Sequence, residues 1–230
     1  MIKWVVIWLF AGMLFVPFRV FPAPCHGTKM PEKNKFFIGF ETNNIFKRYL
    51  EGEYGKMRSL QHHFLLSYGL RDWVSIDLKV GTGLIKQRPV TSSEIDYPSF
   101  FSGGYGFRVK LYEKPGNRIR MVLGFQHVSV HPEKIHLEDQ ENAAILDDWQ
   151  LSFLVSKDFA RLTPYFGAKW SRLDYIHRIG EDRKRRMSDL TKSVGAIFGM
   201  DFSLNDKTYL NLETHFFDEE SFSLGLLYKF

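Results

Sequence analysis

The last ten residues of the chain, 221–230, read SFSLGLLYKF. Apolar or aromatic side chains stand at every second position of this stretch: Phe222, Leu224, Leu226, Tyr228 and Phe230. Successive side chains of a β-strand point to opposite faces, so a period of two predicts a strand with one apolar face. The last residues of a domain usually fray unless something ties them down. An aromatic final residue in phase with the apolar face therefore predicts a last strand that is held by pairing with its neighbours.

The same alternation recurs along the chain after residue 30. In residues 73–85, one face carries Val74, Ile76, Leu78, Val80 and Leu84, and the other carries Ser75, Asp77, Lys79, Gly81 and Gly83. Ten segments with this pattern are predicted as strands: 35–46, 59–70, 73–85, 99–112, 118–130, 147–156, 163–177, 189–202, 207–217 and 221–230. Helical periodicity of useful length is absent from this part of the sequence. The pattern predicts an all-β fold of ten strands, with eight as the alternative if two weak strands are miscounted.

Short and long connections alternate between these strands. The short ones are rich in Pro, Gly, Asn and Asp, as tight turns require, and lie at 71–72, 113–117, 158–161 and 203–206. The long ones lie at 50–58, 86–98, 131–146 and 178–188. Short turns at one end and long loops at the other are typical of a closed, antiparallel, up-and-down transmembrane β-barrel. We therefore expect that architecture.

The first 27 residues resemble an export signal in composition. Lys3 gives a positive start, residues 4–16 form an apolar run, and the small residues Ala23, Cys25 and Gly27 follow. We predict a signal peptide over residues 1–25, a lead-in over 26–34 and the barrel over 35–230. Cys25 is the one cysteine of the chain. Cleavage after it leaves no cysteine for a disulfide or a metal site.

Alternation alone does not say whether lipid or water meets the apolar face, because a water-soluble barrel places that face inside. Three features favour lipid outside. The first is the export signal, and the second is a closed barrel's ability to pair every backbone group in lipid. The third is the aromatic residues near predicted strand ends, which are Trp73, Tyr112, Trp149, Phe202 and Tyr228. A soluble secreted β-barrel binding protein remains the alternative.

Two basic residues fall in phase with apolar faces. Arg172 alternates with Phe166 and Trp170 in the segment 163–177, and Lys192 occupies a similar place in 189–202. An arginine on the lipid face costs ~2–4 kcal/mol at mid-membrane and ~0–1 kcal/mol near an interface. Both side chains are therefore expected near the outer rim.

The sequence FSLGLLYKF at 222–230 resembles the C-terminal strand signature of Gram-negative outer-membrane β-barrel proteins. In that family the signature is read by the barrel-assembly machinery. The resemblance implies a protein of the cell envelope that is integral to the outer membrane, with its long loops outside. It also implies assembly through the strand that ends at Phe230.

The polar faces of the predicted strands indicate which side chains fill the inside of the barrel. They carry charges of both signs at Glu41, Asp77, Lys79, Arg108, Lys110, Arg120 and Glu213. They also carry Gln61, His63, Gln126, Gln150, Asn211 and His215. Opposite charges in a narrow lumen pair with one another, and ten strands leave little room after the side chains are packed. We expect either a salt-bridged structural barrel or a narrow, porin-like polar channel.

The stretch GFQHVSVHPE, residues 124–133, places His127 and Ser129 on the lipid-facing side of a strand near its outer end. A serine nucleophile needs a base within hydrogen-bond reach, which neighbours at i and i+2 on one strand face provide. This pair resembles the His-x-Ser element of lipid A 3-O-deacylases and outer-membrane phospholipases A. The resemblance implies a serine esterase acting on acyl chains, with His127 as base, Ser129 as nucleophile and Glu133 or Glu138 orienting the histidine. Asn usually follows the serine in those families, whereas Val130 follows here. The alternative is a set of polar residues leaving the membrane at a strand end.

The remaining features bound the partners. The basic segment 177–186 lies in a predicted outer loop, where it is either solvated or attracted to lipopolysaccharide phosphates. Residues 136–148 are acidic but lack EF-hand spacing, so no metal is expected. No phosphate-binding glycine loop or dinucleotide fingerprint is present, so no cofactor is expected. The expected partners are outer-membrane lipid, lipopolysaccharide and the assembly machinery, without nucleic acid.

Overall fold

The computed structural model describes residues 27–114, 116, 118–137, 139–180 and 182–230. The predicted signal peptide, residues 1–25, lies outside the described residues. So does Glu138, one of the two candidates for a residue that orients His127.

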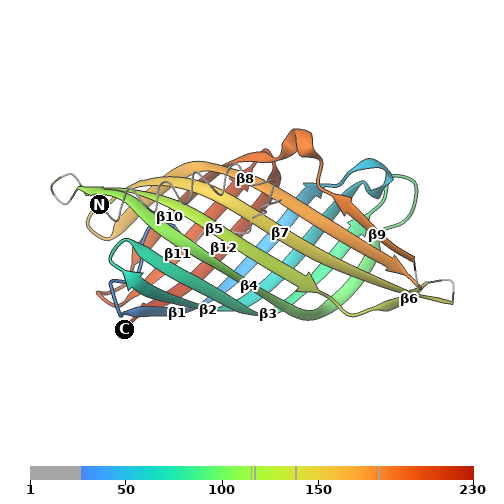
Figure 1. Ribbon diagram of the computed structural model, residues 1–230, viewed down its shortest axis with the longest axis horizontal. Helices are drawn as coiled ribbons and strands as arrows, with labels where there is room; N and C mark the ends of the chain where they lie inside the picture. Colours follow the sequence, from blue (N-terminus) through green and yellow to red (C-terminus); the bar gives the residue numbers. More distant parts are fainter. Residues whose placement is uncertain (1–26, 115, 117, 138, 181) are drawn as a thin grey trace.

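Ten long strands form the barrel in the described part of the chain (Figure 1). They are β1 (Phe36–Tyr49), β2 (Lys56–Arg71), β3 (Val74–Arg88), β4 (Ile95–Lys114), β5 (Ile119–His131), β7 (Gln140–Lys157), β8 (Leu162–Ile179), β10 (Val194–Ser203), β11 (Thr208–Phe216) and β12 (Glu219–Lys229). Two shorter strands, β6 (Ile135–Leu137) and β9 (Asp182–Met187), extend the sheet beyond the barrel at one end. Two 3-10 turns, η1 (Gly52–Tyr54) and η2 (Leu190–Lys192), lie in the connections.

The sheet closes on itself. Each barrel strand pairs antiparallel with the barrel strands before and after it in the chain, and β1 also pairs with β12. This confirms the all-β, closed, up-and-down transmembrane barrel of ten strands and excludes the eight-stranded alternative. At the closure the N–H of Phe230 donates to the carbonyl of Phe36 at 3.0 Å, and their rings stack at 4.6 Å. The aromatic C-terminus is therefore held between the first and last strands.

The two ends of the barrel differ in their connections. The C-terminus and the tight turns lie together at one end, and β6 and β9 lie at the other (Figure 1). We call the first the short-turn end and the second the long-loop end. The β6–β7 and β8–β9 hairpins make the strands longer there than the alternation predicted. β7 begins at Gln140, seven residues before the predicted start, because Ile135 to Leu137 pair with its first residues.

β10 begins at Val194 rather than at the predicted residue 189. Asp189 instead caps the turn η2, where its carboxylate accepts hydrogen bonds from the Thr191 N–H and hydroxyl. These hydrogen bonds lower the pKa of Asp189 from its ordinary value. Lys192 lies in η2, with its ammonium 3.6 Å from the centre of the Tyr49 ring.

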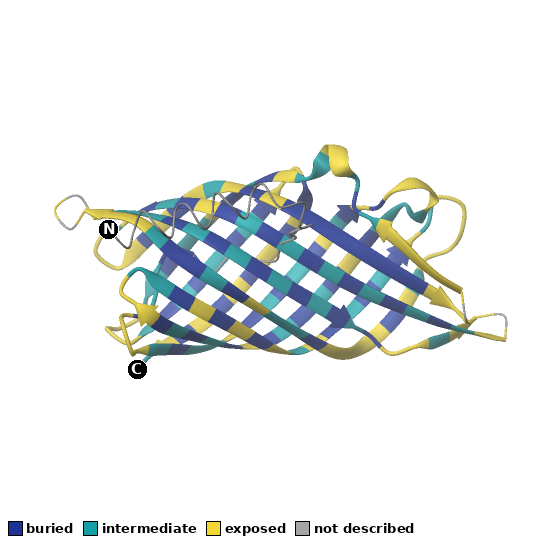
Figure 2. Ribbon diagram, in the orientation of Figure 1, coloured by how far each residue is buried: buried dark blue, intermediate teal, exposed yellow. Residues whose placement is uncertain are grey.

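The apolar face of the sheet is on the outside. Leu78 is 51% exposed while the adjacent Asp77 is 1% exposed, and Leu224 is 43% exposed while Arg108 is 2% exposed. The same alternation gives the chequered pattern of buried and less buried residues along most of the barrel strands in Figure 2. Exposing apolar surface to water costs a free energy of ~25 cal/mol per Å². A barrel with this exterior is therefore suited to a hydrocarbon surrounding.

The inside of the barrel is packed along its length. Toward the long-loop end it is filled by an apolar cluster, which consists of Ile45, Leu50, Met57, Ile85, Tyr97, Val128, Val130, Ala144, Leu146, Leu173 and Tyr175. Ion pairs occupy the middle. At the short-turn end the lead-in enters the lumen, where Thr28 donates to Ser156 at 2.6 Å and Lys29 donates to Ser203 at 3.0 Å. The lumen is therefore blocked at three levels.

This packing predicts that the folded protein does not conduct ions. Planar bilayers that contain it in concentrated KCl should show no current steps beyond those of the same detergent without protein. Reproducible single-channel steps would contradict a filled lumen.

Candidate functional site

A buried ion-pair cluster crosses the middle of the lumen. The guanidinium of Arg48 lies 3.0 Å from Asp218 and 3.1 Å from Glu219. The ammonium of Lys169 lies 3.0 Å from Asp218 and 2.7 Å from Glu219. All four side chains are inaccessible to solvent or nearly so. Two cations thus face two carboxylates, which satisfies charges that would otherwise be very costly to bury.

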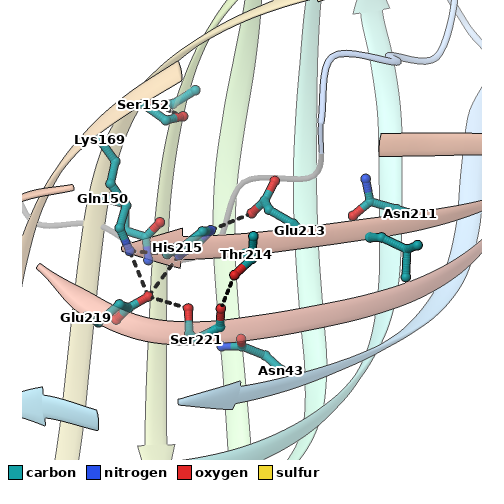
Figure 3. A network of polar contacts seen from close by, with 12 residues as sticks. Asn43, Gln150, Ser152, Lys169, Asn211, Glu213, Thr214, His215, Glu219 and Ser221 are labelled. Carbon is teal, nitrogen blue, oxygen red and sulfur yellow. Dashed lines mark hydrogen bonds and ion pairs between the residues drawn. The ribbon is translucent and has the colours of Figure 1, made fainter. Parts of the chain in front are cut away.

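Hydrogen bonds extend this cluster along β11. His215 contacts Glu219 through Nδ1 and Glu213 through Nε2, each at 2.8 Å (Figure 3). Glu213 in turn accepts from the Tyr165 hydroxyl at 2.9 Å, and Asn211 donates to the same hydroxyl at 2.8 Å. The network joins β1, β8, β11 and β12 across the lumen and holds the strands at a fixed separation.

A β-bulge in β1 brings Arg48 into this network. The pairing of β1 with β12 passes from Ile45 opposite Ser221 to Lys47 opposite Glu220, so Phe46 is an extra residue. An extra residue shifts the alternation by one position. Phe46 and Lys47 consequently face outward, and Arg48 turns inward and is completely buried.

A second group of ion pairs lies closer to the short-turn end. Arg108 binds Asp77 through two nitrogens, at 2.9 and 2.8 Å, and also donates to the Lys29 carbonyl at 2.7 Å. Between the two groups, Lys79 pairs with Glu41 at 2.9 Å. The bidentate geometry makes the Arg108–Asp77 contact one of the stronger kinds of ion pair.

Most of the residues predicted to line the lumen are buried inside it, namely Glu41, Asp77, Lys79, Arg108 and Glu213. Lys110 and Arg120 are less buried and pair with Glu113 near the short-turn end. The structure adds Arg48, Lys169, Asp148, Asp201, Asp218 and Glu219 to the buried charges. Lys169 lies on the face opposite to Trp170, so alternation could have assigned it to the lumen. Asp218 and Glu219 fall in a predicted turn, where alternation assigns no face.

A different cluster lies on the outward face, where β5 and β7 approach the long-loop end. The hydroxyl of Ser129 lies 2.8 Å from His131 Nε2 and also donates to the carboxylate of Asp147. Ser129 and Asp147 are directly opposite each other in the sheet. The register therefore supplies the carboxylate from the neighbouring strand, and a strand face supplies the serine and the histidine.

His127 borders this cluster without a hydrogen bond to Ser129. Its Nε2 lies 3.7 Å from Asp147, beyond hydrogen-bond distance. Its ring packs 4.1 Å from Trp149 and 5.2 Å from Tyr105. His131 rather than His127 is thus the histidine that contacts the serine hydroxyl.

The candidate third residue Glu133 is solvent-exposed, with its backbone N–H bound to the Pro98 carbonyl. The carboxylate beside Ser129 belongs to Asp147 instead. Sequence reasoning missed Asp147 because its contact depends on the pairing register of β5 with β7, which the intervening residues 132–139 do not fix. Asp147 was present in the sequence as the first residue of a predicted strand.

On the β4 side, the partner of Ser129 is Gly103, which has no side chain. The ring of Phe101 lies over that position and borders the cluster. In β8, Arg172 lies opposite Trp149, is only 8% exposed and pairs with Asp174 at 3.0 Å. Within the described ranges, no three His, Cys, Asp or Glu side chains converge where a metal ion could bind.

Comparisons with known proteins find only structural likenesses of low sequence identity. No protein-family model matches the chain, and no curated protein matches it. A similar solved structure is the translocator domain of the autotransporter NalP from Neisseria meningitidis, with 11% identity and a TM-score of 0.45 over 85% of this chain and 88% of that one. The outer membrane protease OmpT from Escherichia coli has 11% identity and a TM-score of 0.42 over 85% and 95%. An outer membrane channel from Pseudomonas putida has 8% identity and a TM-score of 0.44 over 90% and 99%. Such low identities and TM-scores carry no conclusion about activity, so the site is interpreted from this chain's own geometry.

The buried cluster predicts that two arginines on neighbouring strands contribute very differently to the free energy of unfolding. Replacing Arg48 by Met leaves Lys169 as the one remaining Lys or Arg of the described residues beside these two buried carboxylates and should lower the free energy of unfolding by about 3–5 kcal/mol. Arg58 pairs with Glu94 at the surface, where its side chain is 51% exposed, so Arg58→Met should cost less than ~1 kcal/mol. Urea titration of the protein in lipid vesicles measures both. Equal losses for the two variants would contradict the role assigned to Arg48.

Proposed function

We propose that this protein is an integral outer-membrane β-barrel that hydrolyses acyl esters of membrane lipid with Ser129 as nucleophile. The observation that carries the proposal is the contact of Ser129 with both His131 and Asp147 on the outward face of the barrel. A serine, a histidine and a carboxylate within hydrogen-bond reach are the parts that serine esterases use.

The hydrogen bonds define how a proton moves in this site. A serine hydroxyl has one hydrogen, so when it donates to Asp147 the oxygen accepts from the Nε2–H of His131. Attack on an ester requires the other histidine tautomer, with Nε2 free to accept the serine proton. His131 then gives that proton to the departing alcohol, which leaves an acyl group on Ser129, and a water molecule completes hydrolysis. Asp147 stabilises the positively charged imidazole that forms during each step.

The location of the site suits a lipid substrate. Met121, Leu123 and Phe125 continue the same outward face of β5 below His127, which gives acyl chains an apolar surface to lie on. Toward the long-loop end, the lining of a pocket of about 330 Å³ includes Ala143, Ile145 and Ile176. Three basic residues border that pocket: Lys134, Arg178 and Arg183. Ile145 of that pocket is followed on the outward face of β7 by Asp147, which is opposite Ser129, so an anionic head group in the pocket would lie beside the Ser129 cluster.

The barrel offers an internal comparison for this cluster. His62 also faces outward, and its Nδ1 lies 3.0 Å from the hydroxyl of Thr42. That pair has a histidine and a hydroxyl but no carboxylate opposite it, because its neighbour in β3 is Thr82. The carboxylate of Asp147 distinguishes the Ser129 cluster from a polar pair that only satisfies its own hydrogen bonds.

A purely structural surface barrel is the second candidate function. The filled lumen favours it over the narrow channel, because ion pairs and an apolar cluster occupy the space that a solute would need. In either case we propose that the short-turn end faces the periplasm and that the strand ending at Phe230 directs assembly. The support is the alternating signature of residues 221–230 together with the pairing of β12 with β1.

The hydrolase proposal predicts the behaviour of single substitutions. Ser129→Ala should lower fatty-acid release from phospholipid or lipid A by ~10³-fold or more. His131→Gln should lower it by ~10²–10⁴-fold, because the general base is lost. Release of fatty acid by the folded protein in mixed micelles, followed by mass spectrometry, measures both rates.

His62→Gln is the matched control, because it removes an outward-facing histidine that contacts a hydroxyl away from Ser129. It should leave the rate unchanged. Hydrolysis by Ser129→Ala at the rate of the unsubstituted protein would end the proposal. Absence of hydrolysis by the unsubstituted protein on both lipids would favour the structural barrel.

A further inference from the structure

A second basic pocket lies on the outward face near the long-loop end, formed by β1, β2 and β3. Its volume is about 260 Å³, and it is lined mainly by basic side chains: Lys47, Lys56, Arg58, Lys86 and Arg88. Phe46 and Glu94 complete the lining. It is separated from the Ser129 cluster by β4, so it does not depend on the proposed hydrolysis.

The strand register assembles this group. Arg58 is directly opposite Lys86, and Lys56 is directly opposite Arg88, so two basic pairs stack along the outward face of β2 and β3. Like charges directly opposite one another in a sheet are destabilising. The bulge in β1 adds Lys47 to the same side. Anions are needed to neutralise the positive charge of these facing basic side chains.

The carboxylates of the described chain neutralise part of this charge. Glu220 pairs with Lys47, Glu94 with Arg58 and Asp96 with Lys86. Among the described residues no carboxylate forms an ion pair with Lys56 or Arg88. The pocket thus has five cations and three carboxylate partners, and its two unmatched cations face each other across adjacent strands.

The surface next to the pocket is apolar. Leu60 and Leu84 are opposite each other, one outward position closer to the short-turn end than Arg58 and Lys86. Phe46 is 51% exposed and borders the pocket itself. A ligand that matches both surfaces has a compact anionic group attached to hydrocarbon chains.

We propose that this pocket binds the phosphate monoester head group of a membrane lipid whose chains lie on Leu60 and Leu84. A phosphate monoester offers nearly two negative charges and three acceptor oxygens, which suits the unmatched pair of Lys56 and Arg88. The guanidinium of Arg88 binds two phosphate oxygens at once, and the ammonium of Lys56 acts as a point charge. The volume is large enough for a phosphate group.

Ether-linked phosphatidic acid tests this binding, because an acyl hydrolase does not cleave ether-linked chains. Native mass spectrometry of the folded protein in detergent measures the lipid that remains bound. The ether-linked diglyceride with the same chains and no phosphate is the comparison lipid. Wild-type protein should retain the phosphorylated lipid at least ten times more tightly than the diglyceride. The double variant Lys56→Gln, Arg88→Gln should bind it ~30-fold more weakly, since each Lys or Arg near an anionic lipid surface contributes a factor of about five.

The double variant Lys33→Gln, Lys114→Gln removes the same charge from exposed positions near the short-turn end and should bind like the wild type. Equal binding of the two lipids, or equal weakening by the two double variants, would overturn the proposal. So would displacement of the lipid by inorganic phosphate at the same concentration, because free phosphate would then be the ligand. Each outcome is independent of the rate of fatty-acid release at Ser129.

Discussion

The constraint on which the structure depends is that every backbone N–H and C=O surrounded by hydrocarbon needs a partner within the protein. A sheet meets this condition only when its edges are joined, and in this chain the pairing of β1 with β12 joins them. The aromatic C-terminus is part of that closure, since Phe230 donates to and stacks on Phe36. Once the sheet is closed, the period of two sends apolar side chains outward and polar ones inward, so the lumen must satisfy its own charges.

The bulge at Phe46 connects the two sides of the barrel wall. A regular β1 would point Arg48 outward and leave Lys169 as the one Lys or Arg of the described residues beside the carboxylates of Asp218 and Glu219. The extra residue instead places Arg48 among these carboxylates and Lys47 on the outside, at the edge of the basic pocket. One irregularity in the strand thus contributes to the packing of the lumen and to the charge of the surface. Bulges near the ends of barrel strands often re-aim side chains in this manner.

Alternation was sufficient to predict the barrel. It depends on residue type and parity, so Leu78, Leu224, Asp77 and Arg108 could be assigned to their sides without knowledge of the pairing. The strand ends were less predictable, because β9 is basic on both faces and the first residues of β7 are polar, so the alternation does not extend into them. Asp189 likewise has a strand-like neighbourhood but caps a turn.

The outward cluster shows where sequence reasoning stops. Ser129 and a nearby histidine were visible on one strand, since i and i+2 share a face. The choice between His127 and His131 depends on ring orientation, and the partnership with Asp147 depends on the register of β5 against β7. A loop between those strands leaves that register open by several residues. The outward cluster is therefore assembled by contacts between strands, which the sequence of a single strand does not reveal.

The central claim is that hydrocarbon surrounds the apolar face of these strands. A nitroxide scan of residues 222–228 in vesicles tests it most directly, with Cys25 replaced by Ser and one cysteine introduced at a time. Labels at Phe222, Leu224 and Leu226 should collide readily with oxygen dissolved in the bilayer, and labels at Ser223, Gly225 and Leu227 should be shielded. The opposite parity, or uniform access of a water-soluble nickel reagent to all positions, would contradict the account.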